Sequence, residues 1–183
     1  MKKEKASLEN LSGETKLYLR EVFTVLRAHW TLLSRGGMSH GRSSIGFINE
    51  LSLDAIKLLV RDDEFLYSPA NDDIDPYQYL WDKERELKEN QIKFSFSIMP
   101  WQKEMLTKLR VVLEWGWEIT NEKHDQGSYR DTFIGKGIRM VGSMLDPLVD
   151  GKDVSKIYGS IKSNPKAIQL FVRKLEFEIK DRK

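Results

Sequence analysis

The sequence of 183 residues has no cysteine and only three histidines. The lack of cysteine excludes disulfides, thiolate nucleophiles and cysteine-ligated zinc or iron–sulfur centres. No apolar run reaches the roughly 18–20 residues that a membrane-spanning helix needs. No apolar stretch follows the basic residues 1–6 either, so we find no signal peptide. We therefore expect a cytoplasmic protein that has no membrane partner.

Charged residues are plentiful, but the two signs are unevenly spread along the chain. The formal net charge is +2, yet residues 62–90 hold ten acidic and only three basic side chains. Residues 1–43 and 120–183 carry the compensating excess of lysine and arginine. This separation favours a basic surface that contacts nucleic acid, or head-to-tail association of several copies of the chain.

Hydrophobic periodicity predicts a mainly α fold with six to seven helices around one core. Apolar residues recur at steps of three and four along most of the chain, as they do on one face of a helix. We expect a flexible N-terminal segment over residues 1–12 and a single helical domain over residues 13–183. The predicted helices cover about residues 13–33, 44–61, 76–90, 100–122, 128–145, 154–161 and 165–179.

Apolar and polar residues alternate over residues 92–98, a pattern typical of a β-strand. One strand is not stable alone, so it would pair within the chain or with the same strand of a second copy. One short strand pair near residues 92–98 is thus compatible with the otherwise helical fold. The tryptophans of the 100–122 helix widen its apolar stripe. The candidate protein interface comprises Phe94, Phe96, Trp115 and Trp117.

Two glycine-containing segments carry cations that could hold an anion. The segment 34–44, between the first two predicted helices, contains three glycines, two arginines and a histidine. Flexible backbone and positive charge at the mouth of a helix suit a phosphate. A second group, Arg130, Lys136 and Arg139, lies among three further glycines. Its glycines have two interpretations, a phosphate-binding helix face or close packing against another helix.

Arg35 and His40 are separated by four residues. This spacing resembles the Arg–His motif of the HEPN ribonucleases. The resemblance covers six residues and implies an all-helical fold that cleaves RNA without a metal ion. In it, Arg35 would stabilise the pentavalent phosphate while His40 moves a proton. It also implies a dimer that brings two copies of the motif together.

Other catalytic chemistry finds little support in the sequence. The three histidines do not stand at metal-ligand spacing, and His29 is interpreted as a boundary residue of its amphipathic helix. No P-loop, dinucleotide fingerprint, nucleophile elbow or Glu-x-x-His motif occurs. We therefore expect no metal and no cofactor.

The leading hypothesis is a non-enzymatic helical protein that binds nucleic acid, with RNA favoured, and assembles with itself or with a larger complex. Phosphate contacts of this kind give no sequence specificity. One alternative is a ribonuclease that uses Arg35 and His40, and another is a scaffold that binds only proteins. Lys16 shares a helix face with two of the candidate cations. The candidate nucleic-acid-binding residues are Arg20, Arg27, Arg35, Arg42, Arg130, Lys136 and Arg139.

Overall fold

The computed structural model describes residues 13–35, 44–61, 75–89, 97–124 and 129–183. Side chains are described in the same ranges, except for those of residues 120–134. Over these ranges the chain forms seven α-helices and one turn of 3₁₀ helix but no β-strand. The mainly helical prediction is therefore confirmed.

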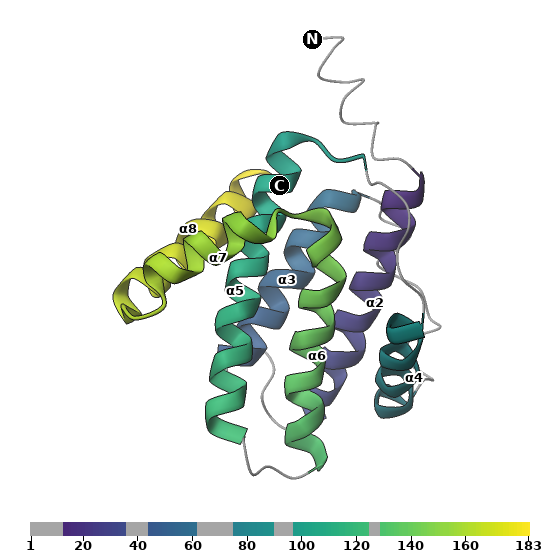
Figure 1. Ribbon diagram of the computed structural model, residues 1–183. Helices are drawn as coiled ribbons and strands as arrows, with labels where there is room; N and C mark the ends of the chain where they lie inside the picture. Colours follow the sequence, from purple (N-terminus) through teal and green to yellow (C-terminus); the bar gives the residue numbers. More distant parts are fainter. Residues whose placement is uncertain (1–12, 36–43, 62–74, 90–96, 125–128) are drawn as a thin grey trace.

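Four helices stand side by side at the centre of the molecule. They are α2 (Gly13–Arg35), α3 (Ser44–Val60), α5 (Pro100–His124) and α6 (Tyr129–Leu145). Helix α2 packs on α3, α3 on α5, α5 on α6 and α6 on α2, which closes a four-helix bundle. Neighbouring members of the bundle run in opposite directions (Figure 1).

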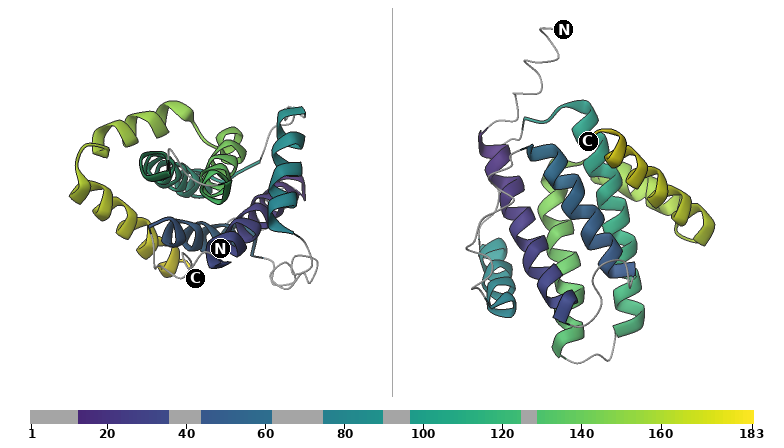
Figure 2. Two further views of the ribbon diagram at one scale, coloured as in Figure 1. Left: turned by 90° about the horizontal axis from the view of Figure 1, so that it is seen from below. Right: turned by 180° about the vertical axis from the view of Figure 1, so that it is seen from behind.

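The remaining helices cover the outside of this bundle. Helix α4 (Pro76–Glu89) packs on α2 and reaches α6, on the right in Figure 1. After the 3₁₀ turn η3 (Asp146–Leu148), α7 (Gly151–Ile161) and α8 (Pro165–Asp181) wrap around α5 on the other side (Figure 2). Helix α8 also contacts α3, so α3 lies between α2 and α8.

Capping side chains start three of these helices. Asp75 accepts a hydrogen bond of 3.0 Å from the backbone N–H of Tyr77 at the start of α4. Asn164 accepts hydrogen bonds from two backbone N–H groups in the first turn of α8. Both helices begin where the sequence predicts. Asp150 caps α7, which therefore begins at Gly151, before the predicted start at residue 154.

The predicted strand at residues 92–98 is described only in part. Residues 97–99 have no regular secondary structure, and residues 92–96, with Phe94 and Phe96, lie outside the described ranges. None of the helices in the described part of the chain is both long and apolar enough to cross a bilayer.

Polar side chains lie in the core where α2, α3 and α6 meet. His29 is fully buried, so its interpretation as a boundary residue is wrong. Its Nδ1 accepts a hydrogen bond of 3.1 Å from the amide nitrogen of Asn49, which also donates to the Leu26 carbonyl at 3.0 Å. A Cβ on Gly137 would lie 2.3 Å from the His29 ring. A side chain at this position of α6 would therefore collide with the ring.

Close packing also explains a second glycine of α6. A Cβ on Gly142 would lie 3.2 Å from the guanidinium carbon of Arg110, which projects from α5. The helix remains unbroken from residue 129 to residue 145 in spite of its glycines. Of the two interpretations of this segment, helix packing accounts for Gly137 and Gly142.

Candidate nucleic-acid interface

The outer face of α2 carries four cations, Lys16, Arg20, Arg27 and Arg35, which we call the α2 strip. Their spacing places them on one side of the helix, over a length of about 28 Å at 1.5 Å per residue. Arg35 is exposed and the other three are partly exposed. Long cationic side chains commonly bury their stems and keep the charged end in water. The strip is therefore suited to contact phosphates along an extended strand.

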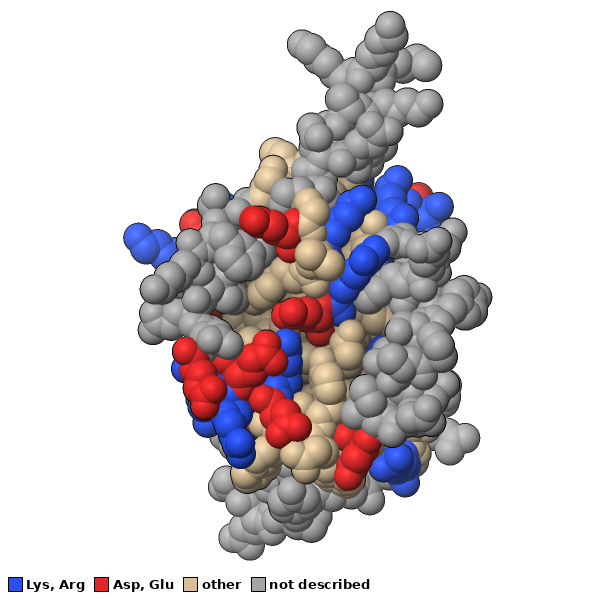
Figure 3. Space-filling model, turned by 90° about the vertical axis from the view of Figure 1, so that its right-hand side faces the viewer, with Lys and Arg blue, Asp and Glu red and all other residues tan. Residues whose placement is uncertain are grey.

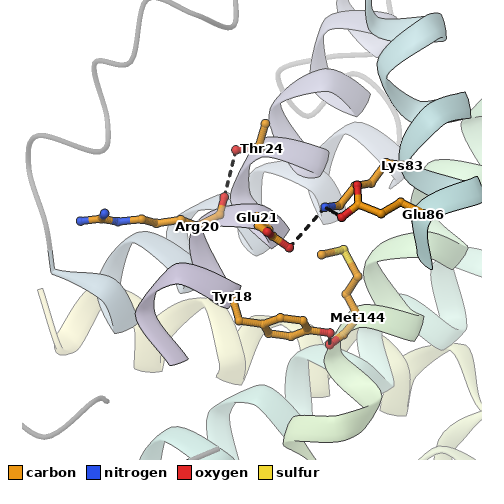
Figure 4. A network of polar contacts seen from close by, with 7 residues as sticks. All are labelled: Tyr18, Arg20, Glu21, Thr24, Lys83, Glu86 and Met144. Atoms are coloured by element: carbon orange, nitrogen blue, oxygen red, sulfur yellow. Dashed lines mark hydrogen bonds and ion pairs between the residues drawn. The ribbon is translucent and has the colours of Figure 1, made fainter. Parts of the chain in front are cut away.

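The opposite side of α2 faces the bundle. Tyr18 donates a hydrogen bond to the carbonyl oxygen of Met144 on α6. Burial raises the pKa of the Tyr18 hydroxyl well above its ordinary value of 10.0, so this hydroxyl stays a donor even in alkaline solution. Figure 4 shows Arg20 pointing away from both Tyr18 and Met144. The strip thus lies on the side of α2 that is remote from α6.

The acidic side chain in the middle of α2 is engaged by α4. Lys83 Nζ lies 3.2 Å from Glu21 and 3.3 Å from Glu86 (Figure 4). The Lys83 side chain is only 7% exposed, whereas the two carboxylates are about half exposed, at 52% and 53%. The contact with Glu21 joins α4 to α2, whereas Glu86 belongs to α4 itself, and the Glu21 carboxylate points away from Arg20.

Three cations of the strip are not neutralised by a carboxylate within the described ranges. There, no carboxylate forms an ion pair with Lys16, Arg27 or Arg35. Two threonines on the same side, Thr24 and Thr31, donate hydrogen bonds of 3.0 Å to the backbone carbonyls of Arg20 and Arg27. Figure 3 shows acidic and basic side chains mixed at its lower left, and both basic and acidic side chains in its upper half.

Lys136, on α6, has different surroundings. Its Nζ lies 3.4 Å from Glu84 on α4 and 5.2 Å from the centre of the Trp81 ring. Lys88 Nζ also lies 3.1 Å from a carboxylate oxygen of Glu84. Burial alone would raise the pKa of Glu84, but the bonds and charges of Lys88 and Lys136 lower it below its ordinary value of 4.5. The charge of Lys136 is therefore partly neutralised by Glu84.

Arg139, one turn further along α6, covers an aromatic ring. Its guanidinium carbon lies 5.3 Å from the centre of the Trp117 ring on α5, a cation–π contact. Arg139 and Lys136 line one hollow of about 340 Å³ between α4 and α6. On its other side, Arg139 lines a hollow of about 270 Å³ that also includes Arg110. Helix α6 thus brings these two candidate cations together.

Arg110 is a residue that the sequence did not single out. Its guanidinium binds Glu114 at 2.7 Å and Asp146 at 2.8 Å. Burial opposes its charge, but the two carboxylates outweigh burial and raise the pKa of Arg110. An arginine held by two carboxylates has little charge to offer to a phosphate. The hollow beside Arg139 is therefore poorly suited to an anion.

The seven candidate cations do not form one surface. Arg20, Arg27 and Arg35 face outward from α2, whereas Lys136 and Arg139 lie on α6 beside α4 and α5. These two groups of cations therefore lie on different surfaces, because α6 packs on the side of α2 away from Arg20. Arg42, His40 and the side chain of Arg130 lie outside the described residues.

The two tryptophans of the candidate protein interface are partly buried. Trp115 and Trp117 pack against the core from α5, and Trp117 lies under Arg139. Part of each ring remains accessible.

Helix α8 carries a surface that the sequence analysis missed. In its buried stripe Val172 is buried, whereas the neighbouring Phe171 is half-buried. On the opposite side of α8, Leu170 and Phe177 are exposed among lysines and an arginine. The spacing of Leu170 and Phe177 is visible in the sequence. Apolar residues of a predicted helix are, however, normally expected to lie in the core.

Neither the described residues nor comparison with known proteins indicates a metal site or a relative. Among the described residues, no group of three or more histidine, aspartate or glutamate side chains could hold a metal ion. The chain matches no family model, and no curated protein or solved structure is detectably similar to it.

Proposed function

We propose that this protein is a non-enzymatic RNA-binding protein and that the α2 strip is its contact surface. The observation that carries the proposal is the row of cations on the outer side of α2, three of which have no carboxylate partner among the described residues. Lysine and arginine side chains bind phosphates without reading bases, and each contact releases counterions. Binding should therefore be insensitive to sequence and strongly weakened by salt.

The test measures binding of a labelled single-stranded RNA at low salt by fluorescence anisotropy. The triple variant Lys16→Gln, Arg27→Gln and Arg35→Gln removes three cations of the strip and leaves the half-buried Arg20 in place. We expect its affinity to fall by about tenfold or more, because several phosphate contacts are lost together.

A matched control removes the same number of charges elsewhere. Arg85→Gln, Lys103→Gln and Lys156→Gln lie on α4, α5 and α7, and all three side chains are exposed. We expect the RNA affinity of this control to lie within about twofold of that of the original protein. The removed charges lie outside the strip, so they act on the RNA only through the screened long-range electrostatic field. Equal losses of RNA affinity in the two triple variants would show that net charge alone attracts the RNA. This result would refute the assignment of RNA binding to the α2 strip.

An enzymatic function predicts a different result in the same samples. If Arg35 and His40 act as the HEPN-like pair, the RNA is cleaved in the presence of EDTA and the cleavage disappears in His40→Ala. We expect the RNA to remain intact with both proteins. Cleavage that depends on His40 would replace the binding proposal with the ribonuclease.

A further inference from the structure

Helix α8 has an open face opposite to the one that it buries. Ile168, Val172, Leu175 and Ile179 point into the core. On the other side, Phe177 is 71% exposed, the highest value of any large apolar side chain in the described part of the chain, and Leu170 is 55% exposed. Leu170 and Phe177 lie two turns apart on this one helix face, with the exposed Arg173 between them.

The open face has the spacing of a helix–helix contact. Lys166, Leu170, Arg173, Phe177 and Lys180 follow one another at steps of four, three, four and three residues, and we call these five exposed residues the α8 seam. The seam is about 21 Å long at 1.5 Å per residue. Lys180 is paired with Glu176 at 3.3 Å, whereas Lys166 and Arg173 have no ion-pair partner among the described residues.

We propose that the α8 seam is a docking surface for an acidic amphipathic helix of another protein. The partner helix would place apolar side chains against Leu170 and Phe177. It would place aspartate or glutamate side chains against Lys166, Arg173 and Lys180. Apolar contacts at alternate seam positions give affinity, and the complementary charges select the partner.

A second copy of the chain does not fit this seam. Pairing two α8 helices would bring the cations of one seam close to those of the other, and like charges in a contact oppose association. The exposed Asp181 and the partly buried Glu176 at its edge are too few to balance these cations. The charge of the seam therefore calls for an acidic partner.

Two other anionic partners fit the seam less well. Helices that lie on membranes separate an apolar stripe from flanking cations, whereas here Arg173 lies on the same line as Leu170 and Phe177. Single-stranded RNA stacks its bases on aromatic rings, and the seam offers only Phe177 for stacking. The alternation of charge and leucine or phenylalanine is better matched by another helix.

The test uses the full chain and a synthetic peptide of about 21 residues, long enough to form a helix in the complex. The peptide carries leucine and glutamate alternately at steps of four and three residues, and its binding is followed by fluorescence anisotropy. Leu170→Ser with Phe177→Ser should weaken binding by about tenfold or more, since burial of two large apolar side chains is lost. Both positions are exposed, so folding should be preserved, which circular dichroism checks.

A charge exchange makes the test specific. The variant Lys166→Glu with Arg173→Glu should lose the acidic peptide and gain affinity for a peptide with lysine at the glutamate positions. Leu17→Ser removes an equally exposed leucine from α2 and should leave binding unchanged. The α2 strip triple variant should also bind the peptide normally, so this result is independent of the RNA-binding proposal.

Three results would overturn the α8 proposal. One is a lack of peptide binding by the unaltered protein, and another is equal binding by the seam variants. The third comes from parallel samples with single-stranded RNA and with phosphatidylserine-containing vesicles. If the seam variants lose one of these ligands but not the peptide, the seam serves that ligand and not a helix.

Discussion

Helices α2 and α6 pack against each other, yet their cations have different surroundings. On α6, Lys136 is paired with Glu84 and Arg139 covers a tryptophan ring. The α2 strip faces away from α6, and Lys16, Arg27 and Arg35 have no carboxylate partner in the described ranges. The neighbouring helices, more than the number of cations in a segment, determine which charges are available to a ligand.

The difference follows from where α4 and α5 lie. Helix α4 contacts both α2 and α6, and it brings Glu84 to the α6 side. Helix α5 brings Trp117 under Arg139. The acidic residue in the middle of α2, Glu21, is drawn toward α4 by Lys83. Each contact reduces the charge on the α6 side or removes a carboxylate from the strip.

The largest expected effect comes from breaking the contact between the two helices. Gly137→Ala places a methyl group 2.3 Å from the His29 ring, which is fully buried and bonded to Asn49. We expect unfolding free energy, measured by urea denaturation, to fall by about 3 kcal/mol. Gly159→Ala is the control, because a Cβ there meets no atom within 4 Å. It should raise stability by about 0.5–1 kcal/mol. Equal stability of Gly137→Ala and the original protein would contradict the packing at His29.

The next effect concerns the contact between α4 and α2. Glu21→Gln with Glu86→Gln leaves the buried ammonium of Lys83 without a carboxylate partner, which should cost about 2 kcal/mol. Lys83→Met keeps a flexible unbranched side chain and returns two half-exposed carboxylates to water, so its cost should stay within about 1 kcal/mol. Thermal unfolding of both variants measures the difference. A costlier Lys83→Met would show that the ion pair itself holds α4.

The smallest stability effect concerns the ion pair between α6 and α4, and it depends on pH. Because the pKa of Glu84 is lowered in the folded protein, its ionised form stabilises the fold at pH values above the ordinary 4.5. This contribution is lost as the pH falls through the lowered pKa of the folded state. We expect Glu84→Gln to melt slightly below the original protein at pH 7, and the difference in melting temperature to shrink as the pH is lowered below 4.5. A constant difference over this range would contradict the assignment to Glu84.

Much of the fold was readable from local sequence. The pairs Asp75-Pro76 and Asn164-Pro165 placed the starts of α4 and α8, because capping and proline act within one turn. The periodicity that predicted α2 reflects the buried face along which it packs on α3 and α6. Strong short-range patterns of this kind need no knowledge of the partner helix.

The candidate site was less predictable because it depends on contacts between distant segments. Nothing near Lys136 in the sequence indicates that Glu84 will pair with it, and nothing near His29 indicates that Gly137 will lie against its ring. Helical spacing in the sequence predicts that the α2 strip faces outward. It does not predict that the strip lies on the side of α2 away from α6. The α8 seam is a different case. The spacing of Leu170 and Phe177 is visible in the sequence, but the sequence analysis did not interpret it as an exposed surface.

The most direct measurement compares the salt dependence of RNA binding for two variants. One is the α2 strip triple variant, and the other is Lys136→Gln with Arg139→Gln on α6. For single-stranded RNA each phosphate contact contributes about 0.7 to the slope of log affinity against log salt. We expect the slope of the strip variant to decrease by about 2 and that of the α6 variant to stay unchanged. An unchanged slope in the strip variant, or an equal decrease in both, would contradict the assignment of RNA binding to α2.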